Sequence, residues 1–76
     1  MTGRPEKHSL TLRGHRTSVS LEADFWTALQ AIAEQRGMPL NELAAVIDTS
    51  RHSDTGLASA IRVFVLRHFQ NAPDDT

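Results

Sequence analysis

The segment from Arg16 to Leu21 restricts the possible folds of this chain more than any other. Its residues alternate in character with the period of two that is typical of an extended strand. One face of such a strand carries Thr17, Val19 and Leu21, and the other carries Arg16, Ser18 and Ser20. A lone strand leaves its backbone N–H and C=O groups without partners, so a second strand must pair with it.

Two partners for this strand are open at this point. Residues 9–12, Ser-Leu-Thr-Leu, also alternate, and they can fold back on residues 17–21 through Arg13-Gly14-His15 as a hairpin within one chain. Alternatively, the strand pairs with the same strand of a second copy across a two-fold axis. A two-stranded ribbon is weak unless helices cover one of its faces, and both arrangements allow that cover.

Three amphipathic helices follow the strand. The first spans residues 22–36 and ends before Gly37, a residue suited to a left-handed cap. The second begins at Pro39, and the third runs from about residue 56 to residue 69 after a loop at residues 49–54. Their apolar stripes consist of Phe25, Leu29 and Ile32; of Leu40, Leu43, Ala44 and Ile47; and of Leu57, Ile61, Phe64 and Val65.

The third helix has more apolar surface than its stripe. Val63, Leu66 and Phe69 extend that surface around the helix, so it is expected to be buried on most sides. Two short helices of the same chain can cover only one flank, and a second subunit would cover the rest. The predicted fold class is therefore mostly α with one short β-strand, assembled as a two-fold dimer through an intermolecular antiparallel ribbon.

Size and charge are consistent with a small binding domain. The 76 residues suffice for one domain, and the absence of cysteine excludes disulfides and thiolate metal sites. Residues 1–21 contain four basic and one acidic side chain, whereas residues 22–76 contain four basic and eight acidic ones. We therefore expect a flexible basic arm at 1–8, a folded domain at 9–70 and a disordered tail at 71–76.

The order of strand and helices resembles that of the ribbon-helix-helix superfamily, the Arc/MetJ-type repressors. More narrowly, the chain is similar to a bacterial ribbon-helix-helix domain family of short proteins. The resemblance covers roughly residues 9–66. It is carried by the segment from Gly14 to Glu22, by Phe25-Trp26, Leu29, Ile32-Ala33, Gly37, Leu40, Leu43 and Ile47-Asp48, and by the segment from Leu57 to Leu66.

The resemblance implies a dimer whose paired strands enter the major groove of double-stranded DNA, which is wide enough for a two-stranded ribbon. It places the outward side chains of Arg16, Ser18 and Ser20 at the base-reading positions. It also implies that the N-terminus of a helix holds a phosphate through backbone N–H groups. Leu40 and Asn41 lie at one candidate helix start, and Asp54-Thr55-Gly56 lie at another, where the aspartate would repel phosphate.

Further roles follow from charge and from the apolar pattern. The expected phosphate contacts are Arg4, Lys7, Arg13, His15, Leu40 and Asn41. The expected dimer interface consists of Thr17, Val19, Leu21, Ile61, Phe64 and Val65. Trp26 is expected to pack between the helices. The spacing of His52 and His68 from other residues fits neither a set of metal ligands nor a catalytic triad.

The resulting function prediction is sequence-specific DNA binding by a cytoplasmic homodimer that regulates transcription. The alternative is a protein–protein adaptor, antitoxin-like or partition-type, that uses the ribbon only for dimerisation and binds a protein partner through its acidic helices or tails. An enzyme is not expected, because the sequence has no glycine-rich phosphate loop and no metal-ligand cluster. No cofactor, metal or membrane span is expected either.

Overall fold

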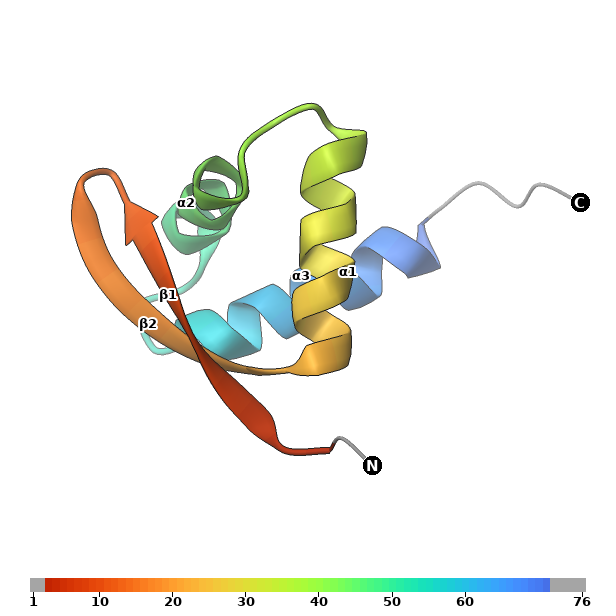
Figure 1. Cartoon of the computed structure of the whole chain (residues 1–76), viewed down its shortest axis with the longest axis horizontal. Coiled ribbons are helices and arrows are strands. Elements are labelled where there is room, and N and C mark those ends of the chain that lie inside the picture. The colour runs from red at the N-terminus through yellow and green to blue at the C-terminus, as the bar shows by residue number, and fades with distance from the viewer. Residues whose placement is uncertain (1–2, 72–76) are drawn as a thin grey trace, which may run out of the picture.

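A β-hairpin and three helices make up the computed structural model, which describes residues 3–71. The elements are β1 (Pro5–Leu12), β2 (His15–Glu22), α1 (Ala23–Gln35), α2 (Leu40–Ser50) and α3 (Leu57–Gln70). The hairpin curves along one side of the helices, and α1 and α3 cross each other beside it (Figure 1). All three helices contact one another, and each contacts at least one strand.

The two strands pair antiparallel within one chain, which decides the alternative that the sequence left open. Leu12 lies opposite His15 next to the turn, and Pro5 lies opposite Glu22 at the far end. The turn consists of Arg13 and Gly14 alone, with φ angles of 53° and 82°. Two positive φ angles are typical of a type I′ turn, whose twist matches that of the strands it joins. The pairing of this strand therefore requires no second copy.

The expectation of one strand preceded by an arm at residues 1–8 differs from this structure. Strand β1 begins at Pro5 rather than after His8, so the sheet has two strands from a single chain. The reason is contact with α1: the half-buried ring of His8 stacks on Trp26, with ring centroids 3.9 Å apart. This stack gives the polar first half of β1 an apolar surface to lie on. Residues 1–2 of the arm and residues 72–76 of the expected tail lie outside the described residues.

The core lies between the inner face of the hairpin and the helices. Leu10, Val19 and Leu21 are the buried side chains that the strands contribute. The helices contribute Leu29, Ile32, Ala33, Leu43, Ala44, Ile47, Ile61 and Val65. Complete burial of a leucine, isoleucine or valine side chain stabilises a fold by about 1.5–3 kcal/mol, so the three strand residues contribute substantially to hairpin stability.

The helices follow the expected stripes, with differences at their ends. Helix α1 ends as predicted: Gly37 has φ 66°, and the N–H groups of Gly37 and Met38 donate to the carbonyls of Glu34 and Ala33. These two bonds are those of a Schellman motif. Helix α2 continues to Ser50, beyond the expected start of the loop. Gly56 precedes the first residue of α3.

An ion pair joins α3 to the end of the hairpin. Arg62 donates from Nε and Nη2 to the two carboxylate oxygens of Glu22, at 2.9 and 3.1 Å. Its Nη2 also donates to the backbone carbonyl of Ser20 at 3.4 Å. The hydrogen bonds from Arg62 hold the pKa of the Glu22 carboxyl below its ordinary value of 4.5. Folding is therefore coupled to the ionisation of Glu22.

We expect Glu22→Gln to destabilise the protein at neutral pH and to have little effect in acid. A carboxyl whose pKa is lowered by folding contributes stability above its unfolded pKa, and this is lost as the pH falls through its folded pKa. The difference in urea midpoint between wild type and variant should therefore shrink as the pH drops below 4.5. Glu42→Gln is the matched control, because Glu42 lies in the first turn of α2 and makes no ion pair within residues 3–71. A midpoint difference for Glu22→Gln that is independent of pH would contradict the coupling.

Candidate nucleic-acid interface

The outward face of the hairpin is continuous, polar and exposed. Directly opposed residues of an antiparallel pair lie on the same face, and the face alternates along each strand. Because Val19 and Leu21 are buried, the residues that alternate with them, Arg16, Ser18 and Ser20, point away from the core. The outward face comprises Lys7, Ser9 and Thr11 of β1, paired respectively with Ser20, Ser18 and Arg16 of β2. All six are exposed.

The side chains of this outward face provide hydrogen-bonding groups and positive charge. Two are cations, Lys7 and Arg16, and the other four have hydroxyl groups that both donate and accept. An arginine can donate two parallel hydrogen bonds to a guanine edge, and a hydroxyl can bond to any base edge. A two-stranded ribbon also fits the width of the DNA major groove. The face thus combines the shape and the chemistry that reading a duplex requires.

The structure brings Arg16, Ser18 and Ser20 together on one exposed surface, as their alternation predicts. It adds three residues that the sequence analysis did not place there. Lys7 was assigned to a mobile arm, and Ser9 and Thr11 received no role. Their signal was present in the alternation Ser-Leu-Thr-Leu of residues 9–12, in which Leu10 points into the core and its neighbours point out.

The remaining expected phosphate contacts lie around the edges of the ribbon. Arg13 is exposed in the turn, and Arg4 is exposed just before β1. His15 is exposed and pairs with Leu12, so its side chain is on the opposite side of the ribbon from Arg16. These three residues surround the outward face without belonging to it.

Helix α2 begins beside the outer edge of β1. The backbone N–H of Thr11 donates to the side-chain Oδ1 of Asn41, with 3.1 Å between N and Oδ1. The helix has no side-chain cap at its start, and Leu40 is half-buried there. Asn41 therefore already has a structural role, which is to attach the ribbon edge to α2.

The residues expected at a dimer interface mostly belong to the core of the single chain. Val19, Leu21, Ile61 and Val65 are at most 5% exposed, and Phe64 packs partly buried against them. Thr17 is exposed although it lies on the inner side of the hairpin opposite Leu10. The hairpin and three helices of one chain enclose the buried side chains of this set, whereas the sequence analysis expected a second subunit to cover them.

Two aromatic contacts fix the helices that carry the ribbon. Trp26 is partly buried against the core, as expected, and the ring of His8 lies nearly parallel to it at 4°. No hydrogen-bond partner for the buried Nε2 of His8 lies within the described part of the chain. The guanidinium of Arg36 lies 5.1 Å from the centroid of the Phe64 ring and so joins α1 to α3.

The comparison with protein families agrees with this arrangement. A family model described as a ribbon-helix-helix domain matches residues 5–69, from the first residue of β1 almost to the end of α3. The chain belongs to the ribbon-helix-helix family. The family is in general one of DNA-binding or dimerising regulators. The curated proteins and solved structures compared with the chain gave no match.

Neither a metal-ligand cluster nor a membrane-spanning helix occurs within residues 3–71 of this ribbon-helix-helix domain. Within that range, no group of three or more histidine, aspartate or glutamate side chains is placed to hold a metal ion. None of the helices in the same range is both long enough and apolar enough to cross a membrane.

We expect Asn41→Ala to expose the Thr11 amide to solvent exchange. A typical intramolecular hydrogen bond has a net worth of about 0.5–1.5 kcal/mol, so the exchange rate of Thr11 should rise by about two- to tenfold. Hydrogen exchange followed by NMR measures the rate for each amide. Asn41→Asp retains an oxygen acceptor and should keep Thr11 protected, and the amide of Leu29 in α1 serves as an internal reference. An unchanged rate for Thr11 in Asn41→Ala would show that the contact does not form in solution.

Proposed function

We propose that this ribbon-helix-helix domain binds double-stranded DNA by inserting its hairpin into the major groove. The observation that supports the proposal is the outward face of the hairpin, where six polar side chains of a two-stranded antiparallel ribbon are exposed and none of the six is a carboxylate. In this function Arg16, Ser18 and Ser20 contact bases, and Ser9 and Thr11 are close enough on the same face to assist. The domain then acts in the cytoplasm as a sequence-specific regulator of transcription.

The charge distribution supports the same proposal. Residues 1–21, which include most of the hairpin, have an excess of three positive charges, whereas residues 22–76 have an excess of four negative charges. A basic ribbon on an acidic body orients the domain toward a polyanion. Lys7, Arg4, Arg13 and His15 would then meet phosphates beside the groove, and the N–H groups of Leu40 and Asn41 would meet phosphate at the start of α2.

We expect Arg16→Ala to weaken binding to the preferred duplex by about tenfold or more, because an arginine that reads guanine contributes about 1–3 kcal/mol of discrimination. The preferred duplex is first selected from a random pool, and affinity is then measured by fluorescence anisotropy at several salt concentrations. Lys7→Ala should instead weaken binding to all duplexes alike and reduce the salt slope by about one.

Arg67→Gln is the matched control for these variants, since Arg67 is an exposed arginine of α3 outside the hairpin. The regulator function is rejected if no duplex binds wild type with an affinity that falls as salt rises. The protein–protein adaptor would then be the remaining function.

We further propose that two copies associate through α3. Leu66 and Phe69 are 54% and 58% exposed, which is unusual for two large apolar side chains near each other on one helix. Burying them against a second copy would place two hairpins on one molecule, as the two half-sites of a palindromic operator require. The hairpin itself is complete within one chain, so the second copy raises the affinity for DNA and sets the distance between the two hairpins.

We expect light scattering of the wild type to give twice the chain mass. Leu66→Glu should give a folded monomer, because it places a charge at the proposed contact without touching the core. Ser59→Glu is the control, because Ser59 is also an exposed position of α3. A folded wild-type monomer at micromolar concentration would reject the dimer without affecting the proposed role of the ribbon.

A further inference from the structure

A groove of about 410 Å³ lies between α2 and α3, on residues that the proposed DNA contacts do not use. Its apolar lining consists of Val46, Ile47, Ala60, Val63 and Phe64. Val46 and Val63 are 47% and 44% exposed, so the groove is open to solvent along one side. The volume falls in the range of about 300–1,000 Å³ that is usual for small-molecule sites.

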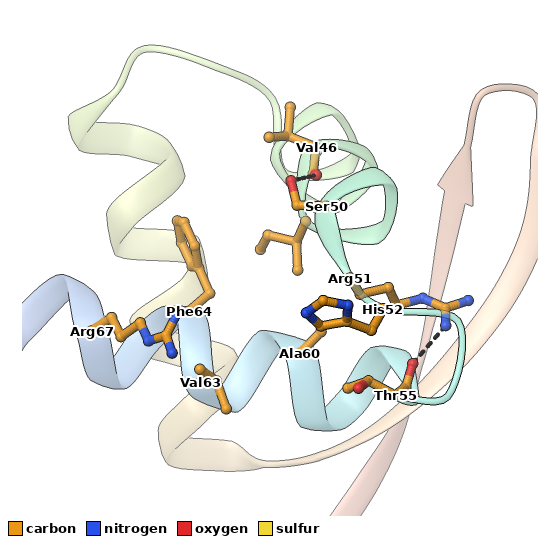
Figure 2. A pocket seen from close by; sticks show the side chains of 10 residues that line it. Val46, Ser50, Arg51, His52, Thr55, Ala60, Val63, Phe64 and Arg67 are labelled. Atoms are coloured by element: carbon orange, nitrogen blue, oxygen red, sulfur yellow. Dashed lines mark hydrogen bonds between the residues drawn. The ribbon is translucent and has the colours of Figure 1, made fainter.

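Cationic and hydrogen-bonding groups stand around this apolar lining. Figure 2 shows Arg67 on one side of the groove and Arg51 with His52 on the other. Arg51 is already engaged, because its Nε donates to Asp48 at 2.7 Å and its Nη1 donates to the Thr55 carbonyl. Arg67 makes no ion pair within residues 3–71, and no carboxylate lines the groove.

We propose that the groove between α2 and α3 binds a small carboxylate with an apolar body, such as a medium-chain or aromatic acid. The apolar body would lie against Val46, Val63 and Phe64, and the carboxylate would accept hydrogen bonds from the guanidinium of Arg67. The charge of the groove selects an anion over a cation, and its apolar lining selects against a fully polar anion.

The groove walls are firm enough to form such a site. The hydrogen bonds of Arg51 close the loop between α2 and α3, and the hydroxyl of Ser50 donates to the Val46 carbonyl at 2.9 Å. Phe64 is held from the side of α1 by Arg36. The ligand would therefore enter a site that is largely formed in its absence, which limits the cost of ordering on binding.

The same two helices hold the two strands of the hairpin, which connects this site to the outward face. Helix α2 is bonded to β1 through Asn41 and the Thr11 N–H, and α3 is bonded to β2 through Arg62 and Glu22. A ligand between α2 and α3 that alters their spacing would shift one strand against the other. This effect on DNA reading rests on the proposed function, whereas binding of the carboxylate does not.

Octanoate is the probe for the site, with octanamide as its neutral counterpart and octylammonium as its cationic counterpart. Titration into ¹⁵N-labelled protein should give saturable NMR shifts centred on Val46, Val63 and Arg67. Arg67→Gln should weaken octanoate binding by about tenfold, because a hydrogen bond to a charged group is worth about 1.5–3 kcal/mol. Octanamide should bind about as weakly to wild type as octanoate binds to Arg67→Gln.

Val63→Glu should abolish octanoate binding by placing a negative charge in the groove at an exposed position. Ser59→Glu is the matched control, since Ser59 is an exposed position on the same helix and does not line the groove. It should leave octanoate binding unchanged. The circular dichroism spectra of both variants establish that they fold.

DNA affinity is then measured with and without saturating octanoate, and a change of about threefold or more would establish the connection to the ribbon. If wild type binds no DNA, the proposed function fails, but the NMR titration still shows whether the groove binds octanoate. The site is rejected if octanoate gives no saturable shifts, if octylammonium binds equally well, or if Val63→Glu and Ser59→Glu have the same effect.

Discussion

The burial of one face of the hairpin is the constraint on which the rest of the structure depends. Two strands alone are only marginally stable in water, so they need a covering layer on one side. Leu10, Val19 and Leu21 supply the apolar surface, and all three are at most 5% exposed beneath the helices. The alternation of the strands then puts Lys7, Ser9 and Thr11 of β1 and Arg16, Ser18 and Ser20 of β2 on the solvent side. The exposed polar face of the ribbon is thus a consequence of how its other face is stabilised.

Much of this fold can be predicted from the sequence because its signals are local. The alternation of β2, the apolar stripes of the helices and the glycine cap of α1 are all patterns among residues that are close together in the sequence. The pairing of the strands cannot be predicted from such a local pattern, because alternation shows that a strand needs a partner without showing which strand it is. Arg13 also makes the turn difficult to predict, because arginine at positive φ is uncommon. An Asn-Gly or Asp-Gly pair would have indicated the hairpin directly.

The same distinction explains the outcome at the candidate site. Arg16, Ser18 and Ser20 were predicted from the alternation of one strand, and that alternation also decides their exposure. Lys7 was expected to contact phosphate from an arm, and its place on the outward face was not predicted because the contact that makes its segment a strand, the stack of His8 on Trp26, joins residues far apart in the sequence. The dimer contacts were assigned to Ile61 and Val65 because their stripe was identified correctly, but one chain suffices to cover them.

The two polar anchors of the ribbon both reach backbone atoms of outward-facing residues. Asn41 accepts from the N–H of Thr11, and Arg62 donates to the carbonyl of Ser20 as well as to Glu22. Backbone contacts of this kind hold the strands relative to the helices whatever side chains those positions carry. The side chains of the outward face therefore take no part in the core or in its anchors. Their identity can specify what the ribbon recognises while the fold that presents them stays the same.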